Sequence, residues 1–136
     1  MFLGEYKLKF TGKGRVVLPH KFRQELKGKE VILSRGFENC IWGFDLGDFE
    51  IEARKQLEIS ATEERARYMR RYLFSGSGSV ELDAQGRIII PSALLDFASV
   101  KEEVAIIGAG DHFEIWDAKI WKKHMKEVEV KVGRIS

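Results

Sequence analysis

One feature constrains the fold of this chain more than any other: two of its segments are related to each other. FTGKGRVVLP at residues 10–19 aligns with LDAQGRIIIP at residues 82–91 without a gap, at an offset of 72 residues. RGFENCIWGF at residues 35–44 aligns with AGDHFEIWDA at residues 109–118 at an offset of 74, which pairs Trp42 with Trp116. The sequence therefore predicts two tandem copies of one structural unit, with two residues inserted between the aligned blocks of the second copy.

Each copy has the same predicted order of elements. A short strand leads into a glycine-containing turn, and a β-branched run follows that a proline ends. A short helix comes next, with the proline near its first turn, and then a second hairpin whose turn contains glycine. The expected strands are 6–10, 16–18, 31–34 and 40–44 in the first copy and 80–82, 88–90, 104–107 and 113–116 in the second; the expected short helices are 20–26 and 92–98.

The segments between and after the repeats differ from them in pattern. Residues 45–74 and 117–126 show helical spacing of apolar side chains, and residues 128–136 alternate valine with charge, which suggests an edge strand or a frayed tail. Glycine and serine at residues 75–79 form a natural joint. We therefore expect a first unit at 5–47, a helical linker at 48–76, a second unit at 77–120, and a helix end and tail at 121–136.

The short strands limit how these units can be stable. Neither unit, at under 50 residues, could bury enough apolar surface alone. We expect an α+β fold, mainly β with short helices, in which the two units interleave into one β-barrel with a pseudo-two-fold axis. The matching positions of Trp42 and Trp116 favour packing in the core over base stacking.

Charge is unevenly distributed along the chain. The formal net charge of the 136 residues is only +2. Residues 6–23 nevertheless contain six cations and no acid, and such a basic segment is typical of a surface that binds a polyanion. In a two-stranded ribbon these side chains would fit the major groove of DNA, with the lysines on phosphates and Arg15 on a guanine. The candidate DNA-binding residues are Arg15, Lys13, Lys7, Lys9, Lys21 and Arg23.

The assembled motifs resemble the MraZ family of bacterial transcriptional regulators, whose units are swapped-hairpin domains of the SpoVT-AbrB type. The resemblance covers most of the chain and rests on these segments, in this order: MFLGEY, KGRVVLPHKFR, SRGFENC, FSGSGSVELDAQGRIIIP and VAIIGAGDHFEIWD. It implies binding to short direct repeats in promoter DNA, usually of cell-division and cell-wall genes. It also implies a homo-oligomer, probably closed into a ring, that is cytoplasmic and associated with the nucleoid.

The family's first turn carries an acid followed four residues later by an arginine. The second unit has this pair as Asp83 and Arg87, for which we expect a structural or inter-subunit role, with DNA contact as the alternative. In the first unit Thr11 replaces the acid, and its hydroxyl could cap the turn instead. A further cluster, Arg65, Arg67, Arg70 and Arg71, is interpreted as an exposed helix face.

Other functional classes find little support in the sequence. The three histidines are scattered, the single Cys40 lies in an apolar strand, and the Gly12–Arg15 turn lacks the length and hydroxyl of a phosphate-binding loop. We therefore expect no enzyme activity, metal, cofactor, small-molecule substrate or membrane partner. The alternative that stays open is a protein-interaction module, such as an antitoxin-like barrel that binds a partner protein.

Overall fold

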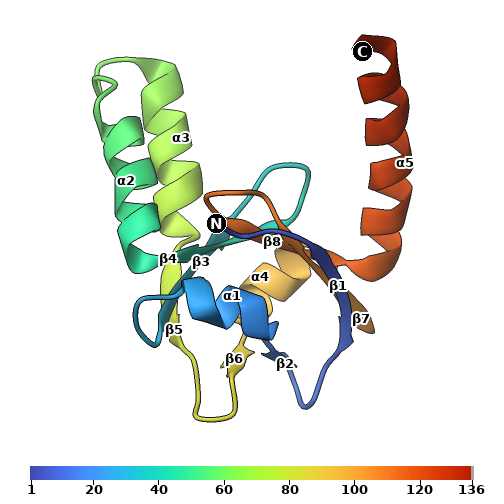
Figure 1. Ribbon diagram of the computed structural model, residues 1–136. Helices are drawn as coiled ribbons and strands as arrows, with labels where there is room; N and C mark the ends of the chain where they lie inside the picture. The colour runs from blue at the N-terminus through green and yellow to red at the C-terminus, as the bar shows by residue number, and fades with distance from the viewer. Residues whose placement is uncertain (136) are drawn as a thin grey trace.

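The computed structural model describes residues 1–135 and contains two antiparallel sheets with five helices around them (Figure 1). The strands of the first unit are β1 (Glu5–Lys9), β2 (Arg15–Val17), β3 (Glu30–Arg35) and β4 (Ile41–Asp45), and those of the second are β5 (Gly78–Glu81), β6 (Arg87–Ile89), β7 (Glu103–Gly108) and β8 (Phe113–Asp117). The helices are α1 (His20–Glu25), α2 (Leu46–Leu57), α3 (Glu64–Ser75), α4 (Ser92–Phe97) and α5 (Ala118–Ile135).

The two units exchange strands. The larger sheet has the order β1-β7-β8-β4-β3-β5, so the first strand of each unit pairs with the third strand of the other unit. The smaller sheet pairs β2 with β6, again one strand from each unit. The interleaving predicted from the short strands is therefore confirmed. A single closed barrel is not found, because the ladder of the larger sheet ends at the edge strands β1 and β5.

The strand pairing also corrects the repeat alignment. Val16 pairs with Ile88 in the small sheet, and Trp42 pairs with Glu114 at the centre of the large sheet; both pairs are 72 residues apart. Trp42 therefore occupies the position of Glu114, and Trp116 that of Phe44, instead of the two tryptophans matching each other. The offset of 74 fails because the second hairpin turn of unit 2 is one residue shorter than that of unit 1, which the longer loop before β7 compensates.

The main core lies between the large sheet, the small sheet and the helices α1 and α4. Alternate residues of the strands point into it, among them Val31, Ile106 and Ile115, which are fully buried. Phe2 joins this core and packs against Phe22 and Phe113. A smaller cluster on the other face of the large sheet contains Cys40, Ala105, Ile107 and Trp116, so the expected burial of Cys40 is confirmed.

The helices follow the sequence pattern in part. Pro19 and Pro91 are the N-caps of α1 and α4, as expected of proline at a helix start. The helical region 45–74 forms the hairpin of α2 and α3. The expectation of an edge strand or frayed tail at 128–136 is wrong for the described residues, because α5 continues to Ile135; Ser136 lies outside them. Valine at every second position permits this helix because Val128 and Val132 are one turn apart on the same face.

Gly43 in β4 tests the close packing of the core. A Cβ at this position would overlap the ring of Phe113 on the neighbouring strand β8. We expect Gly43→Ala to lower the free energy of unfolding by at least the roughly 1–3 kcal/mol typical of core overpacking. Urea unfolding followed by tryptophan fluorescence measures this change. Gly28→Ala is the matched control, since no heavy atom lies within 4 Å of its added Cβ; equal effects of the two substitutions would contradict the prediction.

Candidate nucleic-acid interface

The first turns of the two units, here called the tips, lie at the same end of the molecule, away from α2, α3 and α5 (Figure 1). The first tip is residues 11–15 and the second is residues 83–87. Each is closed by a backbone hydrogen bond, from Thr11 N to Arg15 O at 2.8 Å and from Asp83 N to Arg87 O at 2.9 Å. Gly14 and Gly86 have φ angles of 69° and 79°, which favour glycine at this point of the turn.

The two tips are fixed to each other across the small sheet. Leu18 N donates to Gly86 O at 2.8 Å, and Ile90 N donates to Gly14 O at 2.8 Å. Each hydrogen bond joins the strand of one unit to the tip of the other. A ligand that contacts both tips would therefore meet a preformed surface, whose spacing the β2–β6 ladder sets.

In the first tip, Thr11 does the work expected of the missing acid. Its hydroxyl donates to Arg15 O at 3.3 Å and accepts from Arg15 Nε at 3.2 Å, and Arg15 Nη2 donates to Thr11 O at 3.0 Å. The predicted cap by Thr11 is confirmed. Arg15 is half-buried against its own turn, whereas Lys13 is fully exposed at the apex. Since the tip contains no carboxylate, its two positive charges are not neutralised locally.

The second tip has similar geometry and a different charge. Asp83 Oδ1 accepts hydrogen bonds from the backbone N–H groups of Gln85 and Arg87, both at 2.9 Å, and Asp83 Oδ2 pairs with Arg87 Nε at 2.7 Å. The hydrogen bond from the Arg87 backbone is the largest of the interactions that lower the pKa of Asp83, so this carboxylate stays ionised. The expected Asp83–Arg87 pair is confirmed, and it leaves the second tip neutral.

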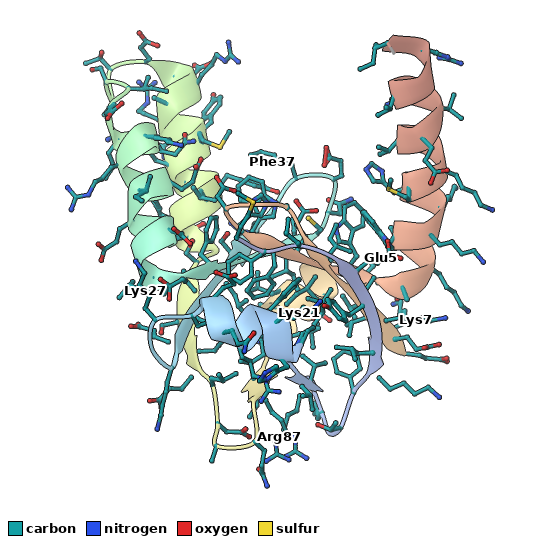
Figure 2. The ribbon with its side chains drawn as sticks, in the orientation of Figure 1. Glu5, Lys7, Lys21, Lys27, Phe37 and Arg87 are labelled. Atoms are coloured by element: carbon teal, nitrogen blue, oxygen red, sulfur yellow. The ribbon has the colours of Figure 1, made fainter. Side chains whose placement is uncertain are left out.

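Helix α1 adds cations next to the tips. The side chain of Arg23 packs against Gly86, where a Cβ would collide with its guanidinium, so a cation of unit 1 lies beside the tip of unit 2. Lys21 is exposed on the same helix, and Lys9 is exposed at the end of β1 that leads into the first tip. Figure 2 shows Lys21 on α1 and Arg87 at the end of the molecule where the tips lie.

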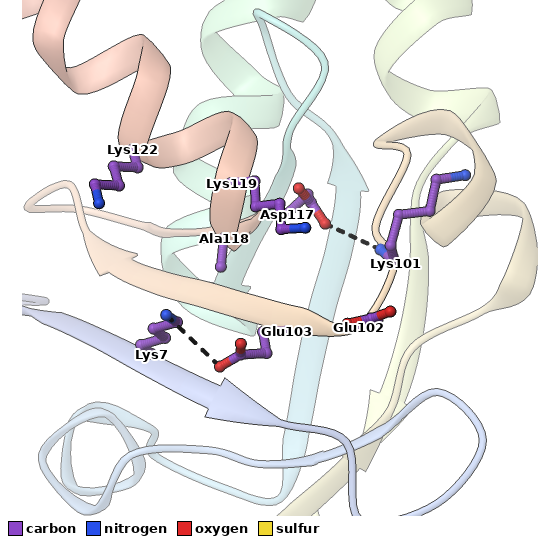
Figure 3. Close-up of a pocket in the computed structure, with 8 residues that line it drawn as sticks. All are labelled: Lys7, Lys101, Glu102, Glu103, Asp117, Ala118, Lys119 and Lys122. Carbon is purple, nitrogen blue, oxygen red and sulfur yellow. Dashed lines mark hydrogen bonds and ion pairs between the residues drawn. The ribbon is translucent and has the colours of Figure 1, made fainter.

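Lys7 does not join this group. It lies on the flank of the molecule, near the start of α5 (Figure 2). Its Nζ is 3.8 Å from Glu103 Oε2. It lines a hollow of about 520 Å³ with Lys101, Lys119 and Lys122 on one side of the charge balance and Glu102 and Glu103 on the other (Figure 3). Strand alternation correctly places Lys7 and Lys9 on one face, but the strand carries Lys7 away from the tip.

The arginine cluster of α3 is only partly an exposed face. Arg67 Nη1 donates to the carbonyls of Ala61 and Thr62 at 3.1 and 3.0 Å, and Arg70 Nη2 donates to Ile59 O at 2.7 Å. These two side chains hold the loop between α2 and α3. Arg65 and Arg71 are exposed.

Sequence reasoning missed a polar network on the outer face of the large sheet. The ring nitrogens of His112 are 2.8 Å from Asp111 Oδ1 and 3.0 Å from Glu114 Oε2, while Glu114 Oε1 accepts from Trp116 Nε1 at 2.9 Å. The ring lies between Trp42 and Phe44, at centroid distances of 4.4 and 5.5 Å. The signal available in the sequence was the HFE triplet, since strand alternation puts residues 112 and 114 on one face.

The network shifts the protonation of its members. Burial of His112 opposes the imidazolium, but the hydrogen bonds to Glu114 and Asp111 outweigh burial and raise the pKa of His112. Burial likewise raises the pKa of Glu114, and the hydrogen bonds from His112 and Trp116 overcome it and lower that pKa. Desolvation raises the pKa of the Cys40 thiol far above its ordinary value, so this cysteine stays protonated and unreactive. Among the described side chains, no three His, Cys, Asp or Glu gather as metal ligands.

Comparison with known proteins gives the family. The model of the MraZ protein family, which is described as antitoxin-like, matches residues 1–72 and 73–132 as two consecutive copies. The chain belongs to the MraZ family. The boundary between the two matched copies falls inside α3, three residues before the end of that helix, so α2 and most of α3 count with the first MraZ repeat.

Named relatives agree with the family assignment. The chain is 39% identical over 136 residues to the transcriptional regulator MraZ of Caldicellulosiruptor bescii, an alignment that covers 100% of this chain and 94% of the relative. It is 39% identical over 129 residues to the MraZ regulator of Roseiflexus castenholzii, covering 95% and 90%, and 36% identical over 124 residues to that of Clostridium acetobutylicum, covering 91% and 87%. None of the helices in residues 1–135 of this MraZ chain has the length and apolar character of a membrane span.

The His112 network predicts a pH-dependent contribution to stability. Because the folded state raises the pKa of His112, the stabilisation is complete below the pKa of the unfolded state and is lost as pH rises through the folded pKa. The lowered pKa of Glu114 acts oppositely, so its share is lost as pH falls through the folded pKa of that carboxyl. We expect His112→Gln to cost about 1.5–3 kcal/mol near pH 6, the range for hydrogen bonds to charged groups, and less at pH 8.5. Urea unfolding at both pH values measures the difference. His20→Gln, at an exposed residue, is the control, and a cost for His112→Gln that does not change with pH would refute the coupling.

Proposed function

We propose that this MraZ-family protein is a DNA-binding regulator of transcription that contacts double-stranded DNA through its tips. The observation that carries the proposal is the charge of the first tip: Lys13 is exposed at the apex and Arg15 lies behind it, with no acid in the turn. Its relatives in three bacteria bear the name transcriptional regulator, which supports the same reading.

The contacts divide by chemistry. Lys13, Lys9 and Lys21 are flexible point charges suited to phosphate oxygens, which position a protein on DNA without reading its sequence. Arg15 offers a planar fork of donors that matches the major-groove edge of guanine. The hydrogen bonds from Arg15 to Thr11 fix the direction of this fork, so that less side-chain freedom is lost when it meets a base. Arg87 is held by Asp83, and we assign that pair to shaping the second tip.

Several finer statements follow from the family resemblance and belong to the same proposal. The DNA site consists of short direct repeats in a promoter, such as those of cell-division and cell-wall genes. Several copies of the chain, assembled into a ring, place first tips on successive repeats, and avidity makes up for the small contact area of one tip. The two interleaved units are of the swapped-hairpin type, and the protein works at the nucleoid without catalysing a reaction.

A second function is supported by one observation. The matching family is described as antitoxin-like, and such a protein would bind and neutralise a partner protein. A single stoichiometric protein that co-purifies with the chain, and that competes with DNA, would favour this function over regulation of transcription.

The tip cations predict two different losses of DNA binding. Lys13→Ala should weaken binding to all sequences alike and reduce the slope of log affinity against log salt by about 1, because one phosphate contact disappears. Arg15→Ala should cost about 1–3 kcal/mol of discrimination between the operator and a scrambled duplex. Fluorescence anisotropy with DNA from upstream of the coding region, at several salt concentrations, measures both quantities.

Two controls separate contact from folding. Lys123→Ala removes an exposed cation from α5, at the end of the molecule away from the tips, and should leave DNA affinity unchanged. Thermal unfolding of Arg15→Ala shows whether the tip variant remains folded, since Arg15 also holds its turn. Unaltered operator binding by a folded variant that lacks both Lys13 and Arg15 would refute the proposed interface.

A further inference from the structure

Helices α2 and α5 are equivalent elements with different neighbours. Each follows the last strand of its unit, and Asp45 and Asp117 at the two junctions both accept a hydrogen bond from a backbone N–H, of Lys27 and Lys101 respectively. Helix α2 packs on β3, β4 and α3, whereas α5 packs on β7 and β8. Figure 1 shows α5 standing apart from the α2–α3 hairpin, with its second half extending beyond the sheet.

The uncovered length of α5 carries an apolar stripe. Trp121, Met125, Val128, Val132 and Ile135 recur at alternating spacings of four and three, a pattern typical of a helix that packs on another helix. Trp121 reaches the sheet and lies 5.3 Å from the ring of Trp116. The far end does not, and Val132 and Ile135 are 51% and 85% exposed. The stripe thus continues past the surface that the chain itself provides for it.

A second apolar surface lies on α2 and the loop that follows it. Ile51, Leu57 and Ile59 are 57%, 52% and 46% exposed, although α3 covers another side of α2 with the buried Ala66 and Leu73. We call Ile51, Leu57 and Ile59 the α2 surface. Since Arg70 donates to the carbonyls of Leu57 and Ile59, the backbone that presents this surface is held in place.

The two surfaces are opposite in charge. Residues 46–63 contain five acids and two cations, whereas α5 contains six cations and two acids. Side chains of opposite sign around two apolar patches favour their mutual contact and disfavour the contact of either patch with itself. Within one copy the two surfaces are on separate arms of the molecule, so they can meet only between copies (Figure 1).

We propose that the α2 surface of one copy of this chain docks against the α5 stripe of a second copy. The contact is head-to-tail, because each copy uses a different surface toward each neighbour, and such contacts either close into a ring or continue as a filament. The proposal rests on the proposed function in one respect, since this contact would build the oligomer invoked there. It makes no use of the tips, which point away from both surfaces.

Complementation between two defective variants tests the contact. Val132→Glu with Ile135→Glu damages the α5 stripe, and Ile51→Glu with Leu57→Glu damages the α2 surface. We expect the unchanged chain to be oligomeric by light scattering at about 100 μM and each variant alone to be monomeric. An equimolar mixture should contain dimers and nothing larger, because one intact surface of each kind remains for pairing.

The controls make each outcome decisive. Val130→Glu alters an exposed valine on the opposite side of α5 and should leave the oligomer intact. Circular dichroism of every variant shows whether it is folded. A monomeric unchanged chain would overturn the proposal, and so would a folded α2-surface variant that keeps the full oligomer size, since that result would mean that α5 pairs with α5.

The outcome is separable from the fate of the proposed function. Association is measured without DNA, and a chain lacking Lys13 and Arg15 should associate like the unchanged chain. Conversely, the monomeric variants should keep the weak, salt-sensitive affinity of a single first tip for any duplex. Failure of association with preserved DNA binding would overturn the docking contact alone, and loss of DNA binding by an intact oligomer would overturn the interface at the tips alone.

Discussion

The exchange of strands between the two units is the constraint on which the rest of the structure depends. β1 completes the sheet of unit 2, β5 completes that of unit 1, and β2 and β6 form a ladder that neither unit has alone. Isolated hairpins of this size are marginally stable in water. The shared core therefore makes the two halves one folding unit, and it also sets the distance between the tips, because each tip is hydrogen-bonded to the strand of the other unit.

Approximate symmetry gives the protein two copies of each feature, and the sequence then makes the copies different. The first tip is cationic with Thr11 as its cap, while the second is neutralised by Asp83. Helix α2 is covered by α3 and acidic in its surroundings, while α5 is uncovered and basic. An arrangement of two equivalent sites would permit association of a surface with itself. Two different sites at related positions instead give the molecule a direction, which suits a protein that binds repeated sites in one orientation.

The sequence predicted well those features that local chemistry controls. Gly14 and Gly86 marked the turns because of their positive φ, and Pro19 and Pro91 marked the starts of α1 and α4. The partners of Arg15 and Arg87 were also foreseen, since each lies four residues from the side chain it contacts. The cation-rich tip could be assembled from strand alternation alone, apart from Lys7, whose position depends on how far the edge strand runs from the tip.

Features that depend on contacts between distant residues were not foreseen. The Ile–Trp dipeptides at 41–42 and 115–116 looked equivalent, but the pairing of Trp42 with Glu114 places them two positions out of register. The position of Arg23 beside Gly86 and the enclosure of His112 by Trp42 and Phe44 likewise arise from tertiary packing. The valine pattern after Lys126 fitted a strand and a helix equally, and the continuation of α5 decided between them.

The pairing of β1 with β7 has a consequence for synthesis of the chain. Residues 5–9 find their hydrogen-bonding partners at residues 103–107, almost a hundred positions later. The nascent first half must therefore wait, with its apolar strand faces uncovered, until most of the polypeptide has left the ribosome. Such distant pairing slows folding, and at a translation rate of about 5–20 residues per second the wait lasts several seconds. During that interval the amino-terminal half is a natural client for chaperones that bind extended apolar segments.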